Sequence, residues 1–239
     1  MSSSNTHTWL ITGTSRGIGL AMTGQLLADP SNTVIATCRN PDSAKSLRAL
    51  EADAGGRLHI VAMDVADEES IRSSFTKVES ILRDRGLDYI YNNAGAFEGS
   101  DTAFTFKAAV AMRMFQANVL GPALVAQTFL PLLEKGRRKV VVNMSSALAS
   151  LSLGTVGPAY ASYAISKTAL NMLTYKQKTE KPDIVFVGMD PGWVKTAMGG
   201  DDATLEPEES ASHILKVVTK LSTKDSGKFL RYTGEEIPW

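Results

Sequence analysis

Two residues of one predicted helix, Tyr163 and Lys167, have the types and the spacing for acid–base chemistry. Residues four apart share a helical face, so the ammonium group can lie beside the phenol. Tyrosine has an ordinary pKa of about 10, and a cation about 4 Å away at an effective dielectric constant of about 20 contributes roughly 4 kcal/mol. That is roughly three pKa units before desolvation is subtracted. Tyr163 is therefore predicted to exchange a proton with a substrate oxygen near neutral pH.

The spacing of Tyr163 and Lys167 is by itself weak evidence for catalysis, since it also occurs on ordinary helix surfaces. A serine nearby in the predicted fold strengthens this interpretation. Ser146 follows the apolar run 139–144, and sites in doubly wound sheets lie at the carboxyl ends of strands. Its hydroxyl would hydrogen-bond a substrate carbonyl and orient it towards Tyr163. We choose Ser146 over the adjacent Ser145; a polar strand end with no catalytic role is the alternative. The nearby Tyr160 lacks a lysine four residues on.

A proline in a long helical pattern supplies a possible proton path. Pro122 has no N–H to bond the carbonyl of Asn118, four residues earlier. That carbonyl could hold a water molecule that connects Lys167 to solvent. A simple kink at Gly121-Pro122 is the alternative interpretation.

Three glycines follow the first predicted strand with the spacing G-x-x-x-G-x-G, at Gly13, Gly17 and Gly19. Glycines let the backbone approach a pyrophosphate whose charge lies at a helix N-terminus. The spacing differs from the G-x-G-x-x-G fingerprint, and no lysine completes a P-loop. A plain strand–helix turn is the alternative, although three glycines in seven residues are conformationally costly.

The charge at the end of the second strand indicates which dinucleotide binds. A carboxylate usually holds the ribose 2′-hydroxyl of NAD there, but this chain has Arg39, and Arg16 lies inside the glycine loop. Guanidinium groups suit a 2′-phosphate, so we favour NADP(H) over NAD(H). Asp42 is the competing carboxylate, but it follows Pro41 and is expected to start a helix.

The elements that must position these residues alternate between short apolar runs and longer helical patterns. We expect strands at 8–12, 33–37, 58–63, 89–92, 139–144, 184–189 and 228–231, and helices near 18–28, 42–53, 67–85, 102–134, 160–179 and 207–222. The strands show little polar alternation, which is typical of strands buried on both faces. The pattern predicts an α/β fold: a single doubly wound Rossmann-type domain over 1–239, with a seven-stranded parallel sheet flanked by helices.

Composition narrows the class of protein. The 239 residues are 44% hydrophobic and carry 25 basic and 25 acidic side chains, so the formal net charge is +0. We therefore expect a globular protein that binds neither nucleic acid nor a membrane surface. A lone cysteine, Cys38, allows no internal disulfide, and the scattered His7, His59 and His213 predict no metal site. The polar N-terminus, and the lack of an apolar run near 18 residues, predict a cytoplasmic location.

Taken in order along nearly the whole chain, these motifs resemble the short-chain dehydrogenase/reductase family. The resemblance implies that Asp64-Val65 contacts adenine, that Asn93 lies near the cofactor, and that Val194 and Thr196 bind the nicotinamide carboxamide. It also implies a catalytic tetrad of Asn118, Ser146, Tyr163 and Lys167. The full set of expected cofactor-binding residues is Gly13, Ser15, Arg16, Gly17, Ile18, Gly19, Arg39, Asp64, Val65, Asn93, Ala94, Gly95, Tyr163, Lys167, Pro191, Gly192, Val194 and Thr196.

The C-terminal segment resembles one branch of that family. Residues 226–229, Gly234 and Pro238-Trp239 are similar to the C-factor-like branch, which includes carbonyl reductases and fungal norsolorinic-acid-type ketoreductases. The resemblance implies an NADPH-dependent enzyme that reversibly reduces a small ketone or aldehyde, with a secondary-metabolite ketone among the candidates. Two departures affect the substrate pocket: Ser146 and Tyr163 are 17 residues apart (163 − 146), about a helical turn more than is usual, and the first glycine after the serine is Gly154.

Other functions remain open at this stage. A catalytically silent NADP(H)-binding scaffold or sensor would keep the glycine loop and have no need of the tetrad. A methyltransferase would use a glycine loop but not the tyrosine–lysine pair. The family resemblance also implies a homodimer or homotetramer built from helices 102–134 and 160–179, although monomers occur.

Overall fold

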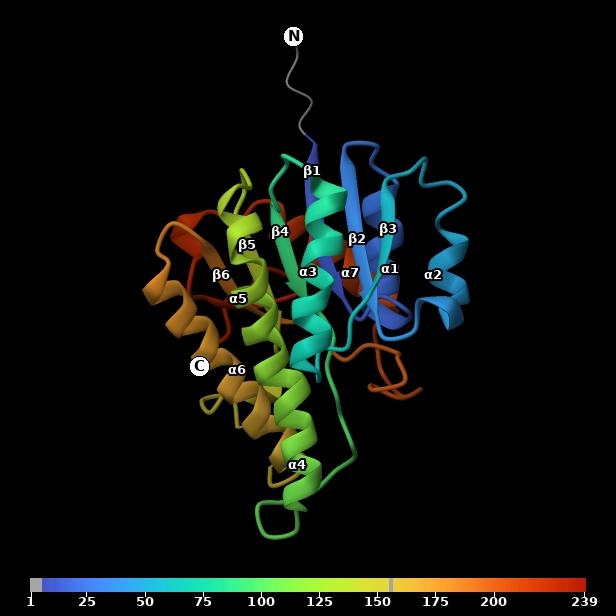
Figure 1. Ribbon diagram of the computed structural model, residues 1–239. Coiled ribbons are helices and arrows are strands. Elements are labelled where there is room, and N and C mark those ends of the chain that lie inside the picture. Colours follow the sequence, from blue (N-terminus) through green and yellow to red (C-terminus); the bar gives the residue numbers. More distant parts are fainter. Residues whose placement is uncertain (1–5, 155–156) are drawn as a thin grey trace.

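Seven parallel strands form one sheet in the order β3-β2-β1-β4-β5-β6-β7 (Figure 1). The computed structural model describes residues 6–154 and 157–239. The strands are β1 (His7–Thr12), β2 (Asn32–Cys38), β3 (Leu58–Ala62), β4 (Tyr89–Asn92), β5 (Val140–Met144), β6 (Val185–Asp190) and β7 (Phe229–Arg231). The order reverses between β1 and β4, and ligands of such sheets bind beyond the strand ends at that point. The predicted α/β class and seven-stranded parallel sheet are confirmed.

Helices cover both faces of the sheet because its strands are apolar on both sides (Figure 1). The helices are α1 (Gly17–Leu27), α2 (Lys45–Ala49), α3 (Glu68–Leu82), α4 (Ala108–Phe115), α5 (Gly121–Glu134), α6 (Ala161–Glu180) and α7 (Pro207–Val218). On β1, Trp9 and Ile11 pack in one core with residues of α1 and α7. Leu10, between them, packs in the other core with residues of α3 and α5. Alternation along one strand thus supplies two cores.

The bounds of the predicted helices shift by up to a few residues, and two of the helices differ in kind or by more than a turn. The helix expected from residue 102 begins at Ala108, because Thr102 and Thr105 hydrogen-bond each other's side chain and backbone in a turn. The helix expected at 42–53 is a 3-10 turn at Pro41–Ser43 followed by the short α2. Asp42 lies in this turn, but Pro41 begins it, so Asp42 does not start a helix as predicted.

The long helical segment contains a local change of winding rather than a simple kink. Gln116–Leu120, between α4 and α5, form a π-helical turn in which the N–H of Gly121 donates to the carbonyl of Gln116. This widening precedes Pro122, which lies in the first turn of α5, where its missing N–H costs little. Such turns are frequent at functional sites.

The continuous helix Ala108–Glu134 is long and apolar enough to cross a membrane by length and composition. The expectation that no segment approaches this length of apolar chain is therefore wrong by that criterion. The α5 part packs on the sheet and on α3, with Val125, Phe129 and Leu132 fully buried in the core. Core packing accounts for its hydropathy.

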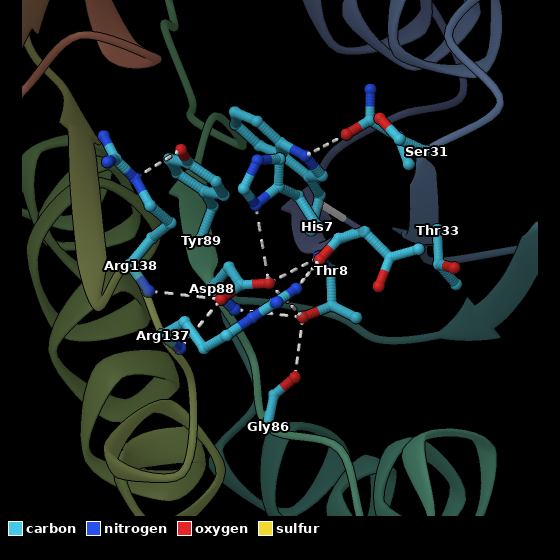
Figure 2. A network of polar contacts seen from close by, with 12 residues as sticks. His7, Thr8, Ser31, Thr33, Gly86, Asp88, Tyr89, Arg137 and Arg138 are labelled. Carbon is cyan, nitrogen blue, oxygen red and sulfur yellow. Dashed lines mark hydrogen bonds and ion pairs between the residues drawn. The ribbon is translucent and has the colours of Figure 1, made fainter. Parts of the chain in front are cut away.

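The amino ends of the central strands are held by one buried carboxylate, Asp88 (Figure 2). It lies just before β4 and accepts hydrogen bonds from the N–H of Thr8 at 3.0 Å, of Arg137 at 2.8 Å and of Arg138 at 3.1 Å. Thr8 belongs to β1, and the two arginines precede β5. A single side chain therefore fixes three neighbouring strands at the edge opposite to their carboxyl ends.

Candidate active site

Most of the predicted site residues meet at the carboxyl edge of the sheet. Pairing places Asn92 of β4 beside Asn143 of β5, and Met144 of β5 beside Met189 of β6. The residues that follow these strands are therefore neighbours in space, although they are far apart in the sequence. Helix α6 brings Tyr163 and Lys167 to the same edge.

Tyr163 and Lys167 share a face of α6, as their spacing predicts. The Lys167 Nζ lies 5.7 Å from the centroid of the Tyr163 ring. Lys167 is buried, and its ammonium group donates a 2.7 Å hydrogen bond to the carbonyl oxygen of Met144, the last residue of β5. The lysine thus ties α6 to the sheet while lying beside the phenol.

The predicted acidification of Tyr163 by this lysine is wrong for the structure. Burial raises the pKa of Tyr163, and the negative charge of Asp190 raises it further, while a contact with the Ser146 hydroxyl opposes the shift. Burial also lowers the pKa of Lys167 to about 8. Desolvation dominates both shifts because both groups are withdrawn from water. Tyr163 therefore holds its proton at neutral pH, which suits a proton donor.

The structure distinguishes the two serines after β5. The hydroxyl of Ser145 is buried and donates to Oδ1 of Asn171 at 2.6 Å. Ser146 begins a 3-10 turn at Ala147–Ala149, where its Oγ accepts from the N–H of Leu148 at 3.3 Å. Its hydroxyl also contacts Tyr163. The geometry favours Ser146, the predicted residue.

Asn118 lies on the π turn and joins three segments. Its side-chain oxygen accepts from the N–H of Ala96 at 2.7 Å, and its Nδ2 donates to the Ala96 carbonyl at 2.9 Å and to the Ser166 hydroxyl at 3.0 Å. A Cβ atom on Gly95 would lie 3.0 Å from Asn118 Oδ1 and 3.6 Å from Lys167 Nζ. The asparagine and the lysine therefore flank the same glycine. The water molecule expected at the Asn118 carbonyl stays a prediction.

The glycine loop has the close approaches that only glycine permits. Gly13 has a φ of 71°, and a Cβ atom there would lie 2.9 Å from the Ala94 Cα. A Cβ atom on Gly19 would lie 2.5 Å from the Gly13 carbonyl oxygen and 2.6 Å from Asn93 Nδ2. Asn93 holds the loop, because its Nδ2 donates to the carbonyls of Thr12 and Gly13. Asn93 is expected near the cofactor; in the structure its side chain contacts the loop itself.

The amino end of α1 is prepared for an anion. Arg16 precedes the helix without a side-chain cap, and the first turn contains no acidic residue. The first N–H groups of a helix have no partner within it, so they can bind a phosphate. Ile18 lies in this first turn, and Ser15 lies in the loop just before it.

The residues expected around the adenosine lie at the ends of β2 and β3. Arg16 and Arg39 are exposed, while Asp42 is paired with Arg48 at 2.7 Å. Asp64 follows β3 and accepts from the N–H of Ala66. The carbonyl of Val65 lies 2.6 Å from where a Cβ atom on Gly121 would be, so α5 packs tightly under this loop.

The segment after β6 lies against the glycine loop. A Cβ atom on Gly17 would be 3.1 Å from Cγ2 of Thr196. Val194 is buried, and Gly192 has a φ of 79° where it follows Pro191. The segment 191–196 therefore lies beside the glycine loop, and its binding of the nicotinamide stays a prediction.

Two residues near Tyr163 escaped the sequence analysis. The ring of Phe97 lies 5.5 Å from that of Tyr163, edge to face, and 5.8 Å from that of Tyr160. No pattern in the sequence identifies Phe97. Asp190 ends β6 next to Tyr163, and its position at a strand end directly before Pro191-Gly192 could have identified it.

Comparison with known proteins agrees with this arrangement. The short chain dehydrogenase family model matches residues 7–206. An uncharacterized oxidoreductase of Schizosaccharomyces pombe is 31% identical over the full length of both chains. C-signal of Myxococcus xanthus is 39% identical over 68% of this chain and 93% of its own.

Solved structures agree as well. The NADPH-bound carbonyl reductase from chicken fatty liver has a TM-score of 0.92 and 35% identity, covering 98% of this chain and 99% of that one. Membership of one family accounts for the sheet order, the glycine loop after β1 and the tyrosine–lysine pair on α6. The chain belongs to the short-chain dehydrogenase family of oxidoreductases.

Proposed function

We propose that this chain reduces a ketone or aldehyde to an alcohol with NADPH, and that Tyr163 donates the proton. The observation that carries the proposal is that the Ser146 hydroxyl contacts Tyr163 and that the Lys167 Nζ lies 5.7 Å from the centroid of its ring. Similarity to a carbonyl reductase bound to NADPH supports the choice of reaction and cofactor.

The residues present fit an NADP(H) dinucleotide. The uncapped start of α1 and the close-packed glycines leave room and donors for a pyrophosphate. The exposed guanidinium groups of Arg16 and Arg39 offer bidentate partners for a 2′-phosphate. Asp64, Val65, Asn93, Val194 and Thr196 are proposed to line the remaining length of the cofactor, as their positions at the strand ends favour.

Each catalytic side chain has a separate task. When bound, NADPH supplies the hydride. The Ser146 hydroxyl orients the substrate carbonyl, and the Tyr163 hydroxyl donates its proton to the carbonyl oxygen as negative charge develops there. The positive charge of Lys167 stabilises the phenolate that remains. Asn118 holds the loop at Ala96 beside the lysine.

The substrate is proposed to be a small molecule with an apolar or aromatic body. The ring of Phe97 packs against those of Tyr163 and Tyr160, and Trp193 is 54% exposed on the segment after β6. Aromatic polyketides, as in fungal secondary metabolism, are therefore included among the candidates. The direct test is NADPH consumption with quinones, aromatic polyketides, steroids and short aldehydes, with NADH as the comparison. Tight NADPH binding with no consumption by any of them would favour the scaffold alternative.

We also propose a homodimer or homotetramer, as the family resemblance implies. Met112 of α4 is 64% exposed, and Ile165 and Met172 of α6 are 55% and 58% exposed. Apolar side chains gathered on two packed helices are typical of a protein interface. Sedimentation of the wild type and of Met172→Asp tests this: the variant is expected to sediment as a smaller species. A cytoplasmic location stays a prediction.

A further inference from the structure

Asp190 is a buried carboxylate at the active edge that has no task in the mechanism above. It is the last residue of β6 and only 5% exposed. Burying a charged side chain is costly unless hydrogen bonds and charges compensate for it, so its partners indicate what it does there.

The carboxylate connects two loops of the site. Its Oδ1 accepts a 2.9 Å hydrogen bond from the N–H of Ala147, the residue next to Ser146. It also accepts from the N–H of Gly192, two residues further along its own chain. Aspartate commonly stabilises a turn in this way. One side chain thus fixes the serine loop after β5 relative to the segment 191–196 after β6.

We propose that Asp190 is a positioning residue of the proposed reductase site, acting through the Ser146 loop and the segment 191–196 rather than on the substrate. This rests on the proposed function for its catalytic consequence. A neutral asparagine could accept the same hydrogen bonds from the two loops without the cost of burying a charge. We therefore expect the charge of Asp190 to have an effect of its own.

The proposed effect of the charge of Asp190 is on Tyr163. The groups that face Tyr163 are Lys167 from α6, Asp190 from β6 and the Ser146 hydroxyl after β5. The carboxylate raises the pKa of the phenol, in addition to the effect of burial. A proton donor must be protonated to work, so this charge favours the form of Tyr163 that reduction requires.

Arg231 balances this charge only in part. From β7, its Nε lies 3.8 Å from Asp190 Oδ2, and its guanidinium is shared with Glu235 at 3.4 Å. Burial raises the pKa of Asp190, whereas Arg231 and the two backbone N–H groups lower it. The contact between Arg231 and Asp190 is thus longer than a hydrogen bond, and Glu235 competes for the same guanidinium.

Two substitutions at Asp190 separate the effect of its hydrogen bonds to the two loops from the effect of its charge. Asp190→Asn keeps an oxygen that can accept the loop hydrogen bonds and removes the charge, whereas Asp190→Ala removes both. Asp88→Asn is the matched control, because Asp88 is also a buried carboxylate that binds backbone N–H groups, but at the opposite edge of the sheet.

The first readout is titration of Tyr163 in the cofactor-free protein, followed by NMR of tyrosine labelled at the ring carbon that bears oxygen and assigned with Tyr163→Phe. Tyr163 is expected to titrate at lower pH in Asp190→Asn than in the wild type, because a nearby negative charge is gone. The control variant is expected to match the wild type. Equal titration in Asp190→Asn and the wild type would overturn the electrostatic part of the proposal.

The second readout is the pH dependence of kcat/KM for carbonyl reduction. Lys167, with a pKa of about 8, and Tyr163 both contribute to the loss of kcat/KM on the alkaline side. In Asp190→Asn that loss is expected to begin at lower pH than in the wild type, because removal of a nearby negative charge lowers the pKa of both groups. Asp190→Ala is expected to lose a further factor of about ten in kcat because the two loops are no longer joined. Equal kcat in the two variants would overturn the positioning role.

The outcomes remain separable. If the wild type reduces no carbonyl, the proposed function fails, and the titration of Tyr163 still decides whether Asp190 controls its proton. If Asp190→Ala does not fold, the hydrogen bonds of Asp190 are needed for folding and the proposed positioning role is overturned. Asp190→Asn then still tests the effect of the charge.

Discussion

At the scale of single residues, the phenol of Tyr163 is partly buried and retains its proton at neutral pH. A proton donor held against the reacting oxygen commonly accelerates a reaction by roughly 10²–10⁴-fold. We therefore expect Tyr163→Phe to lower kcat for carbonyl reduction by roughly that factor. NADPH affinity, measured by fluorescence titration, is expected to stay near the wild-type value.

Tyr160→Phe is the matched control for this substitution. Tyr160 lies three residues earlier and packs on Phe97 through its ring, which phenylalanine keeps. Its activity is expected to remain within a few-fold of the wild type. Full turnover in Tyr163→Phe would remove the tyrosine from the mechanism.

A second prediction at this scale concerns the choice of dinucleotide. Arg39→Asp replaces a guanidinium by a carboxylate at the end of β2, so it should repel a 2′-phosphate and tolerate a 2′-hydroxyl. The Kd for NADPH is expected to rise far more than the Kd for NADH, both measured by calorimetry. Arg72→Gln, on the exposed surface of α3, controls for loss of positive charge. Equal losses for the two cofactors would contradict the 2′-phosphate assignment.

At this scale the sequence predicts features that depend on neighbouring residues in the chain, but not those that depend on distant residues. The pairing of Tyr163 with Lys167 depends on helical spacing alone, and the two residues do share a face. The sign of the Tyr163 pKa shift depends on burial and on Asp190, 27 residues away in the chain (190 − 163). A calculation with one lysine and one dielectric constant omits both, and therefore gave the wrong direction.

At the scale of elements, the glycine loop and Asn93 lie so close to α1 that there is no room for a side chain at Gly19. A Cβ atom on Gly19 would lie 2.5 Å from a backbone oxygen. Gly19→Ala is expected to lower the free energy of unfolding by about 1–3 kcal/mol through overpacking and to weaken NADPH binding. Urea unfolding and cofactor titration measure the two effects.

Gly24→Ala on the same helix is the control. A Cβ atom there meets only the methyl groups of Leu50 at 3.9 Å, an ordinary contact. Because alanine has the higher helix propensity, this variant is expected to gain about 0.5–1 kcal/mol and to bind NADPH normally. Destabilisation by both variants alike would mean that the close approach at Gly19 has no special role.

Element boundaries were predictable where periodicity decided them and not where local geometry did. Strand β5 begins at Val140 rather than at Lys139, because Lys139 has a φ of 51°, which no strand residue adopts. Helix α4 begins six residues later than expected (108 − 102), after the Thr102–Thr105 turn. The residue that follows the π turn, Gly121, packs closely against Val65, and sequence patterns do not contain such a contact.

At the scale of the whole molecule, Asp88 joins β1, β4 and the start of β5 through contacts between residues 49 to 80 positions apart. Asp88→Ala leaves three buried or part-buried backbone N–H groups without their acceptor, and each such loss costs about 1–3 kcal/mol. We expect the free energy of unfolding, measured in urea, to fall by about 2–4 kcal/mol. Because Asp88 lies at the edge away from the site, kcat of the folded protein should not change; an unchanged urea midpoint would contradict its role.

The alternation of strands and helices was enough to predict the parallel sheet, because buried strands and amphipathic helices differ in period. It was not enough to predict the Asp88 network, which depends on side chains brought together only by folding (Figure 2). The same distinction holds for the carboxyl edge: its motifs were visible in the chain, while Phe97 and Asp190 became visible only in three dimensions.

The central claim is that this edge of the sheet transfers hydrogen from NADPH to a carbonyl. The most direct measurement uses NADPH carrying deuterium at the nicotinamide C4 position, with the carbonyl panel and mass spectrometry of the alcohols formed. We predict deuterium on the former carbonyl carbon of at least one product with the wild-type protein, and loss of that product with Tyr163→Phe although NADPH still binds. NADPH bound tightly with no labelled alcohol from any carbonyl would contradict the account.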